Sequence, residues 1–219
     1  MTSSQRNTGA TTPLWRTVRP TLVNTLKVND EVAHEVAQRL LAAKSTPKDA
    51  RVFAAYCQLE RQSDHAFSCL TSGQSGPGIR VIFTSCRTPY DSDHEMVAAV
   101  RSGHLLEVTV SAIDRDRAHP LLGSEPGGAY DRFRAVHDIV GHVAPNLGFD
   151  RDGEFGAWAA QERLVSGLAI WALATELHAE HSVRWTTGEV SDHKAILLDH
   201  DLLNRARQPR WGNLRGLPR

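Results

Sequence analysis

The pattern of apolar and polar positions predicts a mostly helical chain with a small β element. Apolar residues recur at three- and four-residue steps, the period of an amphipathic helix, in several segments. These segments are 29–46, 47–70, 92–103, 130–142, 154–182 and 191–207. Two runs rich in β-branched residues, 79–85 and 105–111, are typical of short strands. We therefore expect an α+β fold, built as a single helical domain.

The composition changes this picture little, but it excludes some functions. Of the 219 residues, 41% are hydrophobic and 23% are charged, as in an ordinary globular domain. Lys+Arg and Asp+Glu both count 25, which argues against a nucleic-acid-binding surface over the whole protein. The sequence contains no run of 18 consecutive apolar residues, so we expect no membrane span. The three cysteines lack paired spacing, so we expect a reduced, soluble, cytoplasmic protein.

The chain divides into one domain and two tails. Residues 1–20 are rich in Ser, Thr, Asn and Arg and are expected to be a flexible N-terminal segment. Residues 21–208 form the single domain, and residues 209–219 form a basic C-terminal tail. Nothing in the pattern decides the oligomeric state, so a homo-oligomer stays open.

The candidate chemistry starts at His137 and His142, in "HDIVGH". Five residues on an ideal helix turn through about 140° beyond a full turn, so the two imidazoles do not share a face. Gly141 lowers the cost of a tightened or unwound turn, which could bring them together. Without such a distortion, the pair would only satisfy hydrogen bonds in the core.

A metal site needs a third group, and Glu176 is the candidate. It follows "LAIWALAT", a run that should be buried, and a lone buried carboxylate is costly unless a cation pairs it. Two histidines and one carboxylate with open positions form the facial triad of non-haem Fe(II) oxygen chemistry. His178 and His181, one turn apart and just after Glu176, could offer a fourth ligand or bind a second metal, although their polar surroundings favour exposure.

"HDIVGH", "FGAWAAQE" and "IWALATE" together resemble the metal-binding core of the pterin-dependent aromatic amino acid hydroxylases. The resemblance covers residues 130–180 and implies iron on His137, His142 and Glu176, with a tetrahydropterin or another reductant as electron donor. Over a longer span the chain is similar to small actinobacterial and phage proteins that share Phe-Arg-Ala-Val-His-Asp-x-x-Gly-His, here beginning at Phe133. That second likeness implies no particular activity.

Four further residues are candidates for the same site. Glu162 could orient a ligand imidazole, or form a surface ion pair with Arg163 or another neighbour. Arg134 lies three residues before His137 and could bind a substrate carboxylate, or simply be solvated. Trp158 and Trp171 could form an aromatic wall for the substrate, or belong to the core.

Three functions remain open at this point. The first is a mononuclear non-haem Fe(II) monooxygenase (hydroxylase) that uses O₂ on a small organic substrate, aromatic or amino-acid-like. The second is a Zn²⁺- or Mn²⁺-dependent phosphohydrolase of the His-Asp type. That class needs further ligands, which would come from His104 or His119 and from Asp199 or Asp201. The third is a non-catalytic protein whose fold a metal stabilises, which a closed set of four ligands would indicate.

Overall fold

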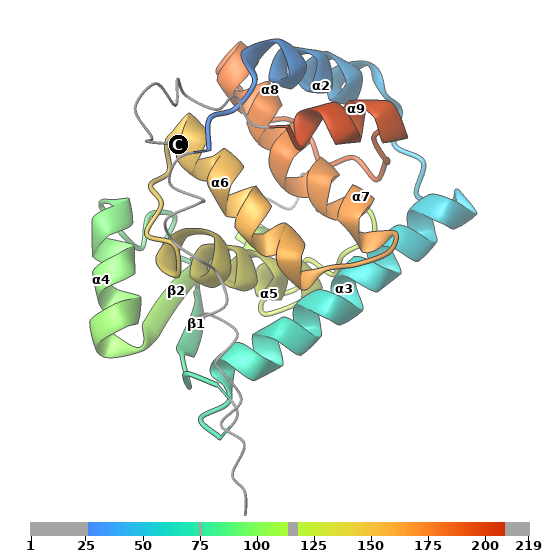
Figure 1. The fold of residues 1–219 in the computed structure, drawn as a ribbon. Helices are drawn as coiled ribbons and strands as arrows, with labels where there is room; N and C mark the ends of the chain where they lie inside the picture. Colours follow the sequence, from blue (N-terminus) through green and yellow to red (C-terminus); the bar gives the residue numbers. More distant parts are fainter. Residues whose placement is uncertain (1–25, 75, 114–117, 209–219) are drawn as a thin grey trace, which may run out of the picture.

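The computed structural model describes residues 26–74, 76–113 and 118–208. Within them the chain is mostly helical with one small sheet, as the pattern predicted (Figure 1). Two of the helical segments are π-helices, which we call the first and the second π-helix. In chain order the elements are α2 (Asp30–Ala42), α3 (Ala50–Thr71), β1 (Arg80–Thr84), α4 (Asp93–Gly103), β2 (Leu105–Thr109), α5 (Ala129–Val136), the first π-helix (His137–Val143), α6 (Arg151–Gln161), α7 (Ala169–Leu173), the second π-helix (Ala174–Ala179), α8 (Glu180–Thr187) and α9 (His200–Ala206).

Polar caps fix where the early helices begin. The Asn29 side chain accepts hydrogen bonds from two backbone N–H groups of the first turn of α2. Asp49 does the same for α3, which therefore begins at Ala50 and not at Pro47. Ser92 caps α4, and His104 ends it in the left-handed region at φ 49°.

The β element is a parallel pair, with β1 and β2 in register from Arg80 opposite Leu105 to Thr84 opposite Thr109. The connection between them is α4, as a parallel pair requires a crossover. Leu106 and Val108 are the buried side of β2 and pack in one core cluster with Val136 and Val140 of the segment that carries the two histidines. The sheet thus supports one side of that segment.

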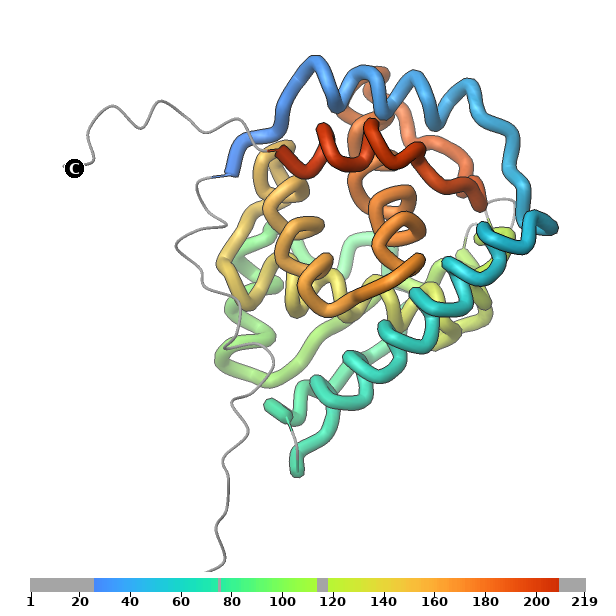
Figure 2. Tube along the Cα trace, turned by 45° about the vertical axis from the view of Figure 1, so that its right-hand side comes forward, coloured from blue at the N-terminus to red at the C-terminus, as the bar shows by residue number. Residues whose placement is uncertain are grey.

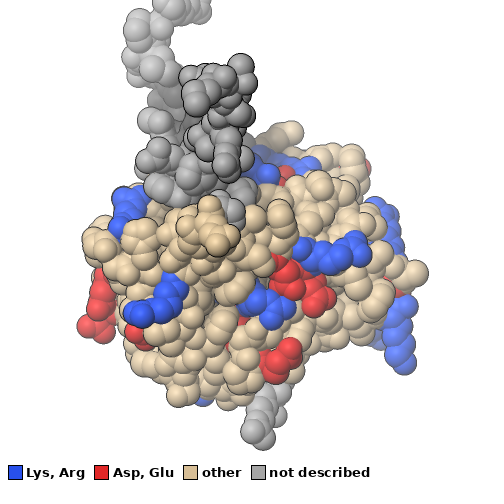
Figure 3. Space-filling view, turned by 90° about the horizontal axis from the view of Figure 1, so that it is seen from below, with Lys and Arg blue, Asp and Glu red and all other residues tan. Residues whose placement is uncertain are grey.

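The helices cover the histidine segment from several sides. Helix α3 packs along α5 and α7, and α6 packs against the first π-helix (Figure 1). Helices α2 and α9 lie side by side over the second π-helix and α8 (Figure 2). On the face seen in Figure 3, Lys and Arg side chains are interspersed with Asp and Glu, in keeping with the zero net charge. None of the described helices is long and apolar enough to cross a membrane.

The predicted helix over 154–182 is wrong as a single element. The chain leaves α6 through a short 3-10 turn, passes through Gly167 at φ 62°, and starts again at α7. Backbone N–H groups of this break donate to the side chains of Gln58 and Gln62 on α3, at Leu168 and Ser166. These tertiary hydrogen bonds replace helical ones between α6 and α7. The helical spacing of apolar residues in the sequence runs across the break, although the backbone there is not α-helical.

The predicted last helix over 191–207 is also too long, since only His200–Ala206 is helical. The preceding segment is held extended against Ser45 and Thr46 by hydrogen bonds to the backbone of Ala195. The tails 1–20 and 209–219 lie outside the described residues, so the predictions made for them stay predictions. On α9, just before the C-terminal tail, Arg205 forms an ion pair with Glu35.

Candidate metal centre

The first π-helix brings His137 and His142 together. In a π-helix the backbone hydrogen bonds join residues five apart, and Ala144 N donates to Ile139 O at 2.8 Å in this way. Side chains five apart then lie nearly one above the other. His142 Nε2 lies 3.2 Å from His137 Nε2, and the two rings meet edge to face. The distortion that the spacing required is therefore present.

Gly141 matters for a different reason from the one expected. Its backbone is not in the left-handed region; what it provides is space. A Cβ at this position would lie 2.9 Å from the Ala157 Cβ of α6 and 3.2 Å from His137 Nδ1. The missing side chain lets α6 approach the π-helix closely, and α6 carries the next member of the site.

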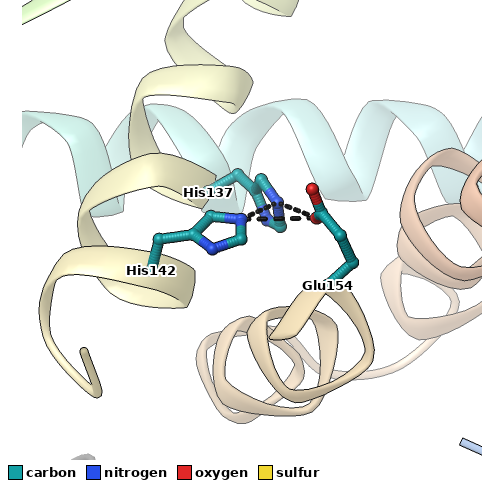
Figure 4. A group of neighbouring side chains, drawn as sticks. All are labelled: His137, His142 and Glu154. Carbon is teal, nitrogen blue, oxygen red and sulfur yellow. Dashed lines mark hydrogen bonds and ion pairs between the residues drawn. The ribbon is translucent and has the colours of Figure 1, made fainter. Parts of the chain in front are cut away.

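The carboxylate that meets the two histidines is Glu154, from the first turn of α6 (Figure 4). Its Oε2 lies 3.4 Å from His137 Nε2 and 3.3 Å from His142 Nε2. The three side chains are buried and point toward one another from two helices. An ion about 2.1 Å from each donor atom would hold those atoms about 3.0–3.4 Å apart in octahedral or tetrahedral geometry. The observed separations match that range.

Hydrogen bonds behind the rings decide which nitrogens face the centre. The backbone carbonyl of Leu147 can only accept, so His142 Nδ1 carries a proton and donates to it at 3.3 Å. His137 Nδ1 donates to Gln161 Oε1 at 2.9 Å. Each neutral imidazole therefore directs the lone pair of Nε2 inward, toward the other lone pair and toward a carboxylate oxygen. Three electron-rich atoms in contact require a proton or a cation between them.

The pKa values reflect this crowding. Burial lowers the pKa of His137 below its usual value. Burial also opposes the charged form of His142, but the Glu154 carboxylate outweighs it and raises the pKa of that imidazole. Burial would raise the pKa of Glu154, yet the imidazoles around it hold that pKa well below its usual range. The surrounding imidazoles thus favour the ionised form of the carboxylate.

His181 and His178 lie next to the centre on the outer side. His181 Nδ1 is 3.1 Å from Glu154 Oε2, and its side chain is 25% exposed. His178 is buried, contrary to the expected exposure, and stacks on Trp158 at 4.5 Å. Burial lowers the pKa of His178 to about 3. Glu154, His178 and His181 line a cavity of about 10 Å³, which has room for about one water-sized molecule.

Glu176, the predicted third ligand, is not brought to the two histidines. It is buried, as expected, but its Oε1 accepts hydrogen bonds from Tyr56 Oη at 2.6 Å and from His119 Nε2 at 3.0 Å. These two donors come from α3 and from the loop before α5, and they satisfy one of the two carboxylate oxygens. The prediction that Glu176 joins His137 and His142 is therefore wrong, and Glu154 occupies that place.

Glu162, which was expected to orient a ligand imidazole, forms an ion pair away from the two histidines. Its Oε1 pairs with Arg207 Nη2 at 2.6 Å, which realises the ion-pair alternative with a partner from the C-terminal end. The neighbouring Gln161 orients the imidazole in its place. Arg134 donates from Nη1 to Thr109 O at 2.8 Å and lines a separate pocket with Glu180.

The two tryptophans do not form a wall beside the centre. Trp158 is fully buried between α6 and the second π-helix, where it stacks on His178. Trp171 is half-buried against Arg51, whose Cζ lies 5.9 Å from the ring centroid. Both fit the core alternative, and the substrate-binding role has no geometric support at this site.

Glu154 and Gln161 are the functional candidates that sequence reasoning missed. Both stand on α6, on the face that meets the π-helix, seven residues or two turns apart. The signal available was this shared face, together with an acidic residue directly before the apolar run 155–160. That signal is weak, because acidic residues are common in the first turn of helices.

No protein-family model, curated protein or solved structure matches the chain. The likeness to the hydroxylases therefore stays an expectation from the sequence, and the centre is argued from its own geometry.

Proposed function

We propose that His137, His142 and Glu154 bind one divalent transition metal, and that the protein is a mononuclear non-haem Fe(II) oxygenase. One observation carries the proposal. The outer nitrogens of both imidazoles are engaged, so their Nε2 lone pairs and an ionised carboxylate converge at 3.2–3.4 Å. Two imidazoles and one carboxylate are the ligand set of Fe(II) oxygen chemistry, in which the metal supplies O₂ activation.

The surroundings of the centre fit a small gaseous co-substrate. The adjoining cavity of about 10 Å³ admits a molecule the size of water or O₂, and an organic substrate would have to approach from outside it. Trp185 lines the same cavity and is 45% exposed, so an apolar substrate could rest against it. The protein would hold the metal, position His181 beside the carboxylate and keep the ligand set largely dry.

The phosphohydrolase alternative has less support. Asp138 is not a member of the converging group, although the His-Asp class would use it as a ligand. The further ligands that this class needs are engaged elsewhere or exposed. His104 contacts the Pro77 carbonyl, His119 contacts Glu176, Asp199 caps α9, and the Asp201 side chain is 99% exposed.

A metal that only stabilises the fold is the second candidate, because His181 Nδ1 lies 3.1 Å from Glu154 Oε2 and could close the ligand set. The His181→Phe variant separates the two. An open catalytic centre keeps one metal per chain in this variant, whereas a closed four-ligand site loses most of its affinity.

The deciding experiment loads the metal-free protein with Fe(II) under anaerobic conditions and measures iron per chain. We expect His142→Ala to bind one equivalent fewer than the parent protein, and the iron-loaded parent protein to consume oxygen when O₂ and a reductant such as ascorbate are admitted. Stoichiometric zinc in place of iron, with no oxygen consumption, would contradict the oxygenase. No bound metal at all would contradict the whole proposal.

A further inference from the structure

A second cluster of buried acids and imidazoles lies apart from the candidate metal centre. Its members are Glu176 from the second π-helix, Glu180 from the start of α8, and His193 from the extended segment before α9. One donor atom of each lies within 4.8 Å of the others. We propose that this cluster binds a second divalent cation of the first transition row, in a site open to a neighbouring pocket.

The first step of the argument concerns the two oxygens of Glu176. Its Oε1 is engaged by Tyr56 Oη and His119 Nε2. His119 Nδ1 accepts hydrogen bonds from the backbone N–H groups of Leu121 and Leu122, at 3.0 and 2.7 Å. That nitrogen therefore carries no proton in the neutral ring, and Nε2–H must be the donor to Glu176. His119 orients the carboxylate and has no free lone pair for a metal.

The second step concerns the other oxygen. Glu176 Oε2 is buried and has no hydrogen-bond partner among the described residues. It faces His193 Nδ1 at 4.0 Å, and the same nitrogen lies 2.7 Å from Glu180 Oε1. A buried carboxylate oxygen without a donor is costly, and a cation beside it would remove that cost.

The third step concerns charge. Glu176 and Glu180 are two acids in one buried cluster, and their mutual repulsion must be neutralised. Burial, and then the negative charge of Glu176, raise the pKa of Glu180 to about 7. A divalent cation between the two carboxylates would remove this repulsion. Two carboxylates and one imidazole suit Mn²⁺, Fe²⁺ or Zn²⁺ better than a purely oxygen-binding ion.

The fourth step concerns access. Glu180 and His193 line a pocket of about 310 Å³ whose wall also contains Arg134 and Tyr130. Glu176, with its side chain fully buried, lies behind them. A cation held by the three groups would thus have protein on one side and the pocket on the other. Such a site keeps coordination positions for water or for a ligand that enters the pocket.

The test measures Mn²⁺ binding to the metal-free full-length protein by elemental analysis and calorimetry. We expect two equivalents per chain, one of which is lost in Glu180→Gln and in His193→Asn. Glu189→Gln removes the same charge from an exposed position nearby and should keep both. Melting curves report whether each variant folds, and having two variants keeps the test usable when one of them does not.

The outcome also separates this site from the centre proposed above. Loss of one equivalent in Glu154→Gln and of the other in Glu180→Gln supports both sites. Unchanged stoichiometry in both Glu180→Gln and His193→Asn overturns the second site and leaves the first standing. Crystals soaked in Mn²⁺ locate the ion by anomalous scattering; we expect a peak between Glu176, Glu180 and His193, and its absence at saturating Mn²⁺ also overturns the second site.

Discussion

The two clusters share their chemical groups but differ in where the protons lie. Around His137 and His142, hydrogen bonds at Nδ1 leave two lone pairs directed at Glu154. Around Glu176, backbone N–H groups instead donate to Nδ1 of His119, so this ring carries its proton on Nε2 and donates a hydrogen bond to the carboxylate. The first arrangement concentrates nitrogen lone pairs at one point. The second satisfies one carboxylate oxygen and leaves the other open.

The difference teaches that burial of a carboxylate does not by itself identify a ligand of the centre formed by His137 and His142. Glu154 and Glu176 are both buried, with 8% and 3% of their surface exposed. What separates them is whether the neighbouring imidazole presents a lone pair or an N–H, and this depends on the group behind the ring. The predictions below test that distinction.

The largest effect is expected from exchanging each carboxylate for its amide. Glu154→Gln should weaken Fe(II) binding at the first cluster by at least about 100-fold, because a charged ligand becomes a neutral one. Glu176→Gln should leave that affinity unchanged, because Glu176 contacts neither of the two histidines. Anaerobic Fe(II) titrations of both variants measure the difference. If Glu176→Gln lost the iron held by His137 and His142 and Glu154→Gln kept it, the sequence prediction for the third ligand would be right.

The next effect concerns the space at Gly141. Gly141→Ala should destabilise the fold by roughly 1–3 kcal/mol, because the new methyl group would lie 2.9 Å from Ala157 Cβ on α6. It should also weaken the metal site, since α6 carries Glu154. Urea unfolding measures the first effect and Fe(II) titration the second.

Gly103→Ala is the matched control for this substitution. A Cβ there meets nothing within 4 Å, so this variant should be at least as stable as the parent protein. A helix-interior glycine with no packing role would behave in the opposite way at position 141, gaining about 0.5–1 kcal/mol on replacement. A stabilised Gly141→Ala protein would therefore show that the close approach of α6 to position 141 does not contribute to the free energy of unfolding.

A smaller effect is expected behind the ring of His137. Gln161→Leu keeps the volume but removes the acceptor that fixes Nδ1–H, so metal affinity should fall about 10–100-fold. Glu162→Gln, one residue further on, removes only an ion pair with Arg207 and should leave affinity unchanged. The same titrations report both. Equal losses in the two variants would point to a general disturbance of α6 and against a specific hydrogen bond.

The sequence predicted the coarse fold and two of the three residues of the first cluster. Both strands and the distorted turn at His137 and His142 follow from local patterns, which act over a few residues. The carboxylate of the site could not be predicted in this way. The position of the Glu176 side chain depends on hydrogen bonds from Tyr56 and His119, which lie 120 and 57 positions earlier. The break before α7 was missed for the same reason, since side chains of α3 hold it. The spacing of apolar residues along the chain does not predict hydrogen bonds from residues so distant in the sequence.

The smallest effect concerns His178, a buried imidazole outside both converging groups. Burial lowers its pKa to about 3, so it is neutral in the folded protein at pH values where the unfolded chain, with a pKa of about 6.5, binds a proton. The unfolded state then gains protons as the pH falls from 6.5 toward 3, and the folded protein loses stability over that window, by about 1.4 kcal/mol for each pH unit at most.

Replacing His178 by Phe should keep the stacking on Trp158 and remove this contribution. The free energy of unfolding of the metal-free protein, measured by urea denaturation between pH 7 and pH 4, should fall less steeply in His178→Phe than in the parent protein. His94→Gln, at an exposed position of α4, should leave the slope unchanged. If both variants kept the parent slope, His178 would not be held neutral by burial. The loss of stability in acid would then come from the groups that face Glu154 and Glu180, and the contrast between a merely buried histidine and a clustered one would fail.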